Sequence, residues 1–166
     1  MSPGSPEFHI SDGRPFHVAQ QEIRRMWWET YRGVVHPWFC DQFKHMNVRF
    51  YLHHFDDAAF HIWSCMGYSL GKMEEAGIHT VVASVKIDYV QELTQGELFY
   101  IKSAFVRVGS KSCTYFQKMF HAETHELHAT QEGVEVFFDP ATRKAAAMPD
   151  EICALLERNL ASRDDE

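Results

Sequence analysis

A helical repeat of apolar residues begins at Val48 and is the clearest pattern in the chain. Apolar side chains return every three or four positions after it, as they do along the buried face of an α-helix. These positions are Tyr51, Phe55, Ala58, Ile62 and Cys65. Asn47 can cap the first turn, and Gly67 or Gly71 can end the helix. The predicted helix therefore has about five turns.

Three large aromatic residues of this segment, Phe50, Phe60 and Trp63, lie outside that face. A helix that is apolar around much of its circumference has to be covered from several sides. We therefore expect a sheet that wraps around it.

The segments on both sides of this helix have β patterns. Residues 26–40 are rich in aromatic and β-branched residues and predict a strand. Pro37 lacks a backbone donor and is expected at the end of that strand or on an edge. After Gly77, polar and apolar residues alternate. The strands predicted there are residues 80–90, 98–108, 113–121 and 132–138.

These elements predict an α+β domain, with a strand, a long helix and then a four-stranded antiparallel meander curved around the helix. Pro149 opens a short amphipathic helix with apolar residues at Ile152, Leu155 and Leu156. We assign residues 26–149 to the domain and residues 150–166 to this helix and a tail. Residues 1–8 look like a cloning remnant, and residues 9–25 like an N-terminal extension.

The composition indicates an ordinary globular protein and excludes two kinds of partner. Hydrophobic residues make up 45% of the 166 residues, and charged residues 23%. The formal net charge of -7 gives no basic face for a nucleic acid, and no apolar run reaches the roughly 18 residues of a membrane span. The four cysteines are widely spaced, which favours free thiols and a cytoplasmic location.

The polar loop at residues 41–47 carries the strongest candidate chemistry. Asp41 lies where the first predicted strand ends, just before the helix start at Val48. A helix start offers unpaired backbone N–H groups and the positive end of the helix dipole. A carboxylate beside it can attack a polarised carbonyl or activate water against it. This combination suits thioester hydrolysis, although Asp is also a common turn residue at such a position.

The same loop resembles the hotdog-fold acyl-CoA thioesterases of the 4-hydroxybenzoyl-CoA thioesterase type. That family has the pattern Asp-x-x-Gly-His-x-Asn, followed by a Tyr ten residues after the Asp. The matching residues here are Asp41, His45, Asn47 and Tyr51. A second family pattern, Tyr-x-x-Pro-x-x-x-Gly-Asp, is similar to the stretch with Tyr89, Glu92, Gly96 and Glu97. The resemblance covers roughly residues 27–149.

Two positions depart from the family pattern. Lys44 replaces the loop glycine, so the loop backbone cannot have a positive φ there without a steric cost. Glu92 replaces the proline. Residues 36–41 and 45–49 are similar to a subgroup associated with carnitine breakdown, the betainyl-CoA thioesterases.

The resemblance implies a curved sheet around one long helix and assigns roles in the loop. Asp41 would act as nucleophile or as general base, and the sequence does not separate the two. The backbone amide of Val48 would polarise the thioester carbonyl. Asn47 would either cap the helix or orient water. His45 would order the loop through hydrogen bonds rather than act as the base.

Substrate contacts are expected from this region and from one distant turn. Coenzyme A is part of the substrate, so no separate cofactor is expected. Its phosphates need a basic group. Lys111 is the first candidate, ahead of Arg107, Lys118 and Arg143.

Four further residues are candidates for the substrate pocket, namely Tyr51, Tyr89, Trp38 and Glu92. Aromatic faces with a carboxylate can hold a quaternary ammonium group such as that of betainyl-CoA. Bulky aromatic residues also favour a short or polar acyl group over a long fatty chain.

The eleven histidines raise the possibility of a metal site. His54 and His61 share a face of the predicted helix, but their seven-residue spacing is longer than that of the usual ligand pair. His121, His125 and His128 show no recognised ligand spacing. We therefore predict no metal.

A hotdog domain that binds acyl groups or CoA without hydrolysing them is the main alternative function. A hotdog hydratase or dehydratase would need an Asp-x-Asn-Pro-x-His-like stretch, and the sequence has none. The open edge of such a sheet favours pairing with another copy, so we expect a homodimer or a dimer of dimers.

Overall fold

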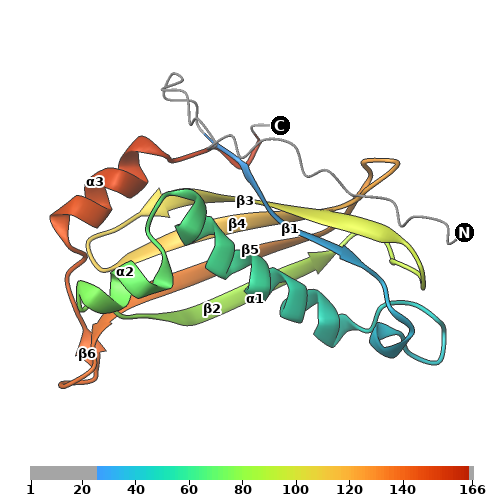
Figure 1. The fold of residues 1–166 in the computed structure, drawn as a ribbon, viewed down its shortest axis with the longest axis horizontal. Coiled ribbons are helices and arrows are strands. Elements are labelled where there is room, and N and C mark those ends of the chain that lie inside the picture. Colours follow the sequence, from blue (N-terminus) through green and yellow to red (C-terminus); the bar gives the residue numbers. More distant parts are fainter. Residues whose placement is uncertain (1–25, 165–166) are drawn as a thin grey trace, which may run out of the picture.

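The computed structural model describes residues 26–164, so the expectations for residues 1–8 and 9–25 lie outside the described part of the chain. An antiparallel sheet curves behind one long helix, with two shorter helices at one end of the sheet (Figure 1). The elements in chain order are β1 (Trp28–Val34), the 3-10 helix η1 (Pro37–Phe39), α1 (Val48–Cys65), α2 (Leu70–Glu75), β2 (Thr80–Tyr89), β3 (Leu98–Val108), β4 (Ser112–His121), β5 (Leu127–Asp139), β6 (Lys144–Ala145) and α3 (Asp150–Arg158).

The α+β arrangement is confirmed, but the predicted meander is only partly right. The strand order is β1-β3-β4-β5-β2, with the short β6 paired to β5. β3, β4 and β5 pair consecutively, whereas β2 pairs with β5 at the far edge and not with β3. Alternation of polar and apolar residues identifies a strand and its buried face, but it does not identify the neighbouring strand.

The segment at residues 90–97 carries the chain across the end of the sheet. The backbone N–H groups of Val90 and Gln91 donate to the His128 carbonyl at 2.9 and 3.1 Å, beside β5. At the other end of the segment, the Gly96 N–H donates to the Val35 carbonyl at 2.9 Å, just after β1. This crossover takes the place of the tight turn that a meander would need.

α1 begins and ends at residues that the sequence predicts. The Asn47 side chain accepts a hydrogen bond from the Arg49 N–H at 3.2 Å, which caps the first turn. Gly67 follows the last turn with a φ of 79°, a conformation that glycine adopts without steric cost. The predicted buried face is present at its first four positions, Tyr51, Phe55, Ala58 and Ile62.

Several local predictions need correction. β1 ends at Val34, and Pro37 opens a 3-10 helix instead of continuing the strand. The sheet does not enclose α1, because Phe60 is 59% exposed and Cys65 is exposed as well. α1 packs mainly against β1 and β3, which leaves its β2 side open. β5 starts at Leu127, and the six-residue α2 was missed because it is too short for a periodic pattern.

A buried row of polar side chains crosses the sheet beneath α1. The hydroxyl oxygens of Thr30 and Ser103 are 2.7 Å apart, and Gln117 Nε2 donates to Ser103 Oγ at 3.0 Å. Gln131 Nε2 donates to Gln117 Oε1 at 2.8 Å. Gln117 Nε2 also donates to the carbonyl of Phe55 in α1 at 3.0 Å. The row therefore joins β1, β3, β4 and β5 to the helix.

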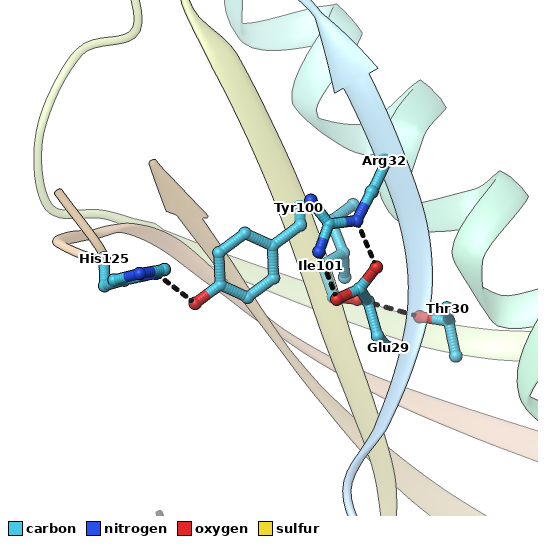
Figure 2. A network of polar contacts seen from close by, with 6 residues as sticks. All are labelled: Glu29, Thr30, Arg32, Tyr100, Ile101 and His125. Carbon is cyan, nitrogen blue, oxygen red and sulfur yellow. Dashed lines mark hydrogen bonds and ion pairs between the residues drawn. The ribbon is translucent and has the colours of Figure 1, made fainter. Parts of the chain in front are cut away.

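Side-chain bonds strengthen the seam between β1 and β3. The Thr30 hydroxyl donates to the Ile101 carbonyl at 3.4 Å. Figure 2 shows this bond beside the ion pair of Arg32 with Glu29. On the far side of β3 in the same view, Tyr100 points toward the His125 ring, with its hydroxyl 3.1 Å from Nδ1.

Two observations bear on the location of the protein. No helix within residues 26–164 is long and apolar enough to cross a membrane. The four cysteines, all of which lie in this range, are free thiols, as the sequence predicts.

Candidate active site

Backbone hydrogen bonds close the loop at residues 41–47 into a tight turn. The Asp41 N–H donates to the His45 carbonyl, and the Lys44 N–H donates to the Asp41 carbonyl, both at 3.0 Å. Asp41 Oδ1 accepts a hydrogen bond from the Phe43 N–H at 2.8 Å. This bond within the turn holds the carboxylate in one orientation. A structural role in the turn and a chemical role are therefore compatible for Asp41.

Lys44 has a φ of 63°, in the left-handed region. The loop therefore has a positive φ at this position, without the low cost that glycine would give it. The turn needs a left-handed residue where the family pattern has glycine, and here a residue with a Cβ atom occupies it. That conformation costs roughly 1–2 kcal/mol for a non-glycine residue.

The crossover at residues 90–97 holds the loop in place. The Met46 N–H donates to the Leu93 carbonyl at 2.7 Å. The Leu93 N–H in turn donates to the Tyr51 hydroxyl at 3.1 Å. Burial raises the pKa of Tyr51, so its hydroxyl stays neutral. Tyr51 therefore ties the first turn of α1 to the crossover.

A cavity of about 350 Å³ lies between this loop, the start of α1 and the end of β2. Six predicted site residues line it, namely Asp41, His45, Val48, Tyr51, Tyr89 and Glu92. Met46, Val90 and Gln91 complete the lining. The sequence analysis missed Val90 and Gln91 because the crossover brings them there, and no local pattern reveals it. A larger hollow of about 580 Å³ beside α2 and α3 contains no residue of the loop.

Val48, the first residue of α1, lines this cavity and has a backbone N–H that is unpaired within residues 26–164. The Asn47 side chain accepts a hydrogen bond from the Arg49 N–H. The Asn47 backbone carbonyl accepts one from the Phe50 N–H at 2.9 Å. No hydrogen bond among the described residues uses the Val48 N–H. The Val48 amide is thus available to a ligand at the positive end of the helix dipole. Two roles were considered for Asn47, capping the helix and orienting water. The observed hydrogen bond to the Arg49 N–H is a helix cap.

Two tyrosines form one wall of the cavity. The rings of Tyr51 and Tyr89 meet edge to face, with centroids 5.1 Å apart. The Tyr89 hydroxyl donates to the Val48 carbonyl at 3.5 Å. Tyr89 is half exposed, so its ring covers the helix start from the solvent side.

Two predicted substrate contacts lie outside this cavity in the single chain. Trp38 is 65% exposed and stacks on the His36 ring, with centroids 4.2 Å apart. Lys111 lies in the turn between β3 and β4, where its Nζ donates to the Ala145 carbonyl at 3.5 Å. Their roles in binding stay predictions.

Residues 35–156, most of the chain, match the sequence profile of the thioesterase-like superfamily. The chain belongs to this superfamily. The predicted hotdog fold and the class of thioester hydrolase are thereby confirmed. The match does not distinguish the 4-hydroxybenzoyl-CoA type or the betainyl-CoA subgroup from other members.

Solved structures share the fold of this thioesterase-like chain at low sequence identity. The hypothetical protein SAV2348 from Staphylococcus aureus, solved in complex with CoA, has a TM-score of 0.71 and 21% identity over 78% of this chain and 81% of that one. The probable thioesterase YbaW from Escherichia coli has a TM-score of 0.69 and 23% identity over 80% and 99%.

A third structure is that of Slr0204, a 1,4-dihydroxy-2-naphthoyl-CoA thioesterase from Synechocystis. It has a TM-score of 0.68 and 17% identity over 77% of this chain and 94% of that one. At these identities the likeness shows the fold alone. No curated protein sequence matches this chain significantly.

Replacing Lys44 with glycine is expected to stabilise the protein or leave its stability unchanged. Glycine removes the cost of the left-handed φ, although it also adds entropy to the unfolded chain. We expect the free energy of unfolding to rise by up to about 1 kcal/mol, measured by urea denaturation.

The matched control is Lys44→Val. The loop still needs a positive φ at this position, and valine brings a β-branched side chain to it. It is expected to lose at least about 1 kcal/mol, because a positive φ is particularly unfavourable for such residues. A glycine variant less stable than the valine variant would show that the loop does not need this conformation.

Proposed function

We propose that this protein hydrolyses a short or polar acyl-CoA to the free acid and CoA at the Asp41 cavity. The observation that carries the proposal is that Asp41 and Val48, whose backbone amide is unpaired among the described residues, line the same cavity. A thioester carbonyl placed against the helix start would be polarised by that amide, and the developing oxyanion would be stabilised there.

Asp41 would supply the attacking oxygen, either directly or through a water molecule. Its Oδ1 is held by the Phe43 N–H, and no hydrogen bond among the described residues uses Oδ2. One oxygen therefore fixes the carboxylate and the other is available for chemistry. Both nucleophilic attack and general-base catalysis fit this arrangement.

Neighbouring residues would position these two groups. Asn47 caps α1 and so fixes where the Val48 N–H points. The backbone carbonyl of His45 accepts a hydrogen bond from the Asp41 N–H and so helps to close the loop. In this scheme neither side chain takes part in the chemical step.

The acyl group would lie beside Tyr51, Tyr89 and Glu92. Two aromatic rings and a carboxylate in one cavity favour a small cationic acyl group, because a quaternary ammonium binds aromatic faces and anions. This supports betainyl-CoA as the first substrate to try. CoA would extend away from the cavity, and Lys111 is the proposed contact for its phosphates.

The sheet edge supports a homodimer. β2 pairs only with β5, so its other edge carries unpaired backbone groups. Val81, Val82 and Val85 on β2 are 46%, 47% and 39% exposed, and Phe60 on α1 is also exposed. An apolar edge strand of ten residues favours pairing of β2 with a second copy of the chain.

We also propose that two such dimers can associate into a dimer of dimers, and that the protein is located in the cytoplasm.

Asp41→Asn is expected to abolish turnover while preserving the fold and substrate binding. The amide keeps the size and the Oδ1 acceptor but loses the negative charge and the basicity. Thiol release should fall by a factor of about 10²–10⁴ or more. Measurements of thiol release, thioester affinity and the thermal midpoint on one preparation separate these effects.

Asp88→Asn on the exposed outer side of β2 is the matched control and should keep full activity. Its carboxylate pairs with Lys86 and does not line the cavity. Near-normal turnover in Asp41→Asn would remove Asp41 from the mechanism. Intact thioester binding without turnover by the wild-type protein would favour the non-catalytic acyl-binding alternative.

A panel of CoA thioesters should show preference for short or polar acyl groups. The cavity of about 350 Å³, narrowed by two tyrosines, suits a small group better than a long chain. We expect betainyl-CoA and other small acyl-CoAs to give higher kcat/KM than palmitoyl-CoA, measured by thiol release. Best turnover with palmitoyl-CoA would contradict the assignment.

The chain is expected to be at least a dimer in light scattering, with about twice the 19.3 kDa of one chain. Val85→Lys places a charge on the β2 surface and should shift the protein toward monomer. Leu98→Lys is the control, because Leu98 is similarly exposed but lies on β3, at the opposite side of the sheet from β2. A stable wild-type monomer that hydrolyses thioesters would refute the dimer.

A further inference from the structure

Three potential metal ligands gather on α1, outside the Asp41 cavity. His53, His54 and Asp57 each offer one ligand atom, and these atoms all lie within 4.8 Å of one another. The rings of His53 and His54 lie near Phe39 of η1, with centroids 6.3 and 4.9 Å from the Phe39 ring. None of the three residues lines the cavity described above.

His54 has an unusual environment for a structural histidine. It is 1% exposed, and its Nδ1 lies 3.1 Å from the Tyr31 hydroxyl. Its Nε2 is buried and has no hydrogen-bond partner. A buried polar atom without a partner is costly unless something else satisfies it.

The Tyr31 contact can prepare this imidazole for a metal. When Nδ1–H donates to the Tyr31 hydroxyl, the lone pair lies on Nε2. A neutral imidazole whose other nitrogen is hydrogen-bonded is the common form of a histidine ligand.

His53 and Asp57 supply the other two ligands from the exposed side. His53 Nε2 and Asp57 Oδ2 are 3.7 Å apart, one helical turn apart on α1. Two ligand atoms of a tetrahedral zinc ion, each about 2.0–2.1 Å from the metal, are themselves about 3.4 Å apart. The pair therefore needs only a small shift to hold an ion. Both side chains are about half exposed, which gives the ion a route from solvent.

We propose that His53, His54 and Asp57 form a binding site for a divalent transition-metal ion, with zinc as the best match. Two imidazoles and one carboxylate suit zinc, whereas magnesium and calcium prefer oxygen ligands. A water molecule would complete the tetrahedral set. The site would tie α1 to β1 through the bond between His54 and Tyr31, and it is independent of thioester hydrolysis.

Isothermal titration of the full chain with zinc chloride, without a histidine tag, tests the proposal. We expect saturable binding of one zinc per chain. His53→Ala and Asp57→Asn should each weaken binding by about tenfold or more, since each removes a direct ligand. His61→Ala and Asp56→Asn are matched controls on the same helix, lie outside the group and should bind zinc like the wild type.

His54 itself is tested without replacing a core residue. Long-range ¹H–¹⁵N spectra should show Nε2 of His54 shifting on zinc addition, while Nδ1 stays protonated. Tyr31→Phe should weaken zinc binding about tenfold with His53 and Asp57 intact, because the bond that fixes the tautomer is lost.

Three outcomes would overturn the site. The first is a wild-type protein that shows no saturable zinc binding. The second is binding that survives both His53→Ala and Asp57→Asn, which would place the ion elsewhere, for instance near His121 and His128, whose ring centroids are 5.9 Å apart. The third is an unchanged His54 resonance at saturating zinc.

Discussion

The hydrogen bond from Gln117 to the Phe55 carbonyl fixes the long helix on the sheet. Apolar contacts are not directional, so they alone would let α1 slide along the curved surface. Gln117 lies in a buried row with Thr30, Ser103 and Gln131, and each member bonds to the next. A buried amide that lost these partners would cost roughly 1–3 kcal/mol. The row therefore specifies one position for the helix between its two apolar clusters.

The candidate site depends on that position. Because α1 is fixed at Phe55, the position of its first residue, Val48, is fixed as well. Val48 lies about two turns away, at the end of the sheet. The crossover passes there and bonds to both sides of the helix start, through Met46 and through Tyr51. The loop that carries Asp41 is therefore held between two rigid parts. The positive φ of Lys44 is a strain that such anchoring can maintain.

Local patterns in the sequence predicted much of this arrangement, and non-local pairings explain most of what they missed. The periodicity from Tyr51 to Ile62 and the cap at Asn47 depend on near neighbours, and both are present. The pairing of β2 with β5 depends on the crossover, which has no periodic signal. The local patterns placed Asp41 and Tyr51 beside one helix end, and the family resemblance added Tyr89 as a substrate-binding candidate. Neither indicated Val90 or Gln91. The sequence indicates that a positive φ at Lys44 would be costly, whereas its presence depends on the tertiary anchoring of the loop.

The same constraint leaves one side of α1 open. Because the helix is held toward β1 and β3, the inner face of β2 is uncovered, and Phe60 and Val82 stay exposed. Tyr89 belongs to this open surface and to the wall of the cavity. A second copy that covered the apolar edge would also screen the cavity from water at Tyr89. Water exclusion strengthens the interaction of a helix end with a developing negative charge. Assembly and chemistry would then depend on the same strand, which is why the free edge of β2 matters for function as well as for stability.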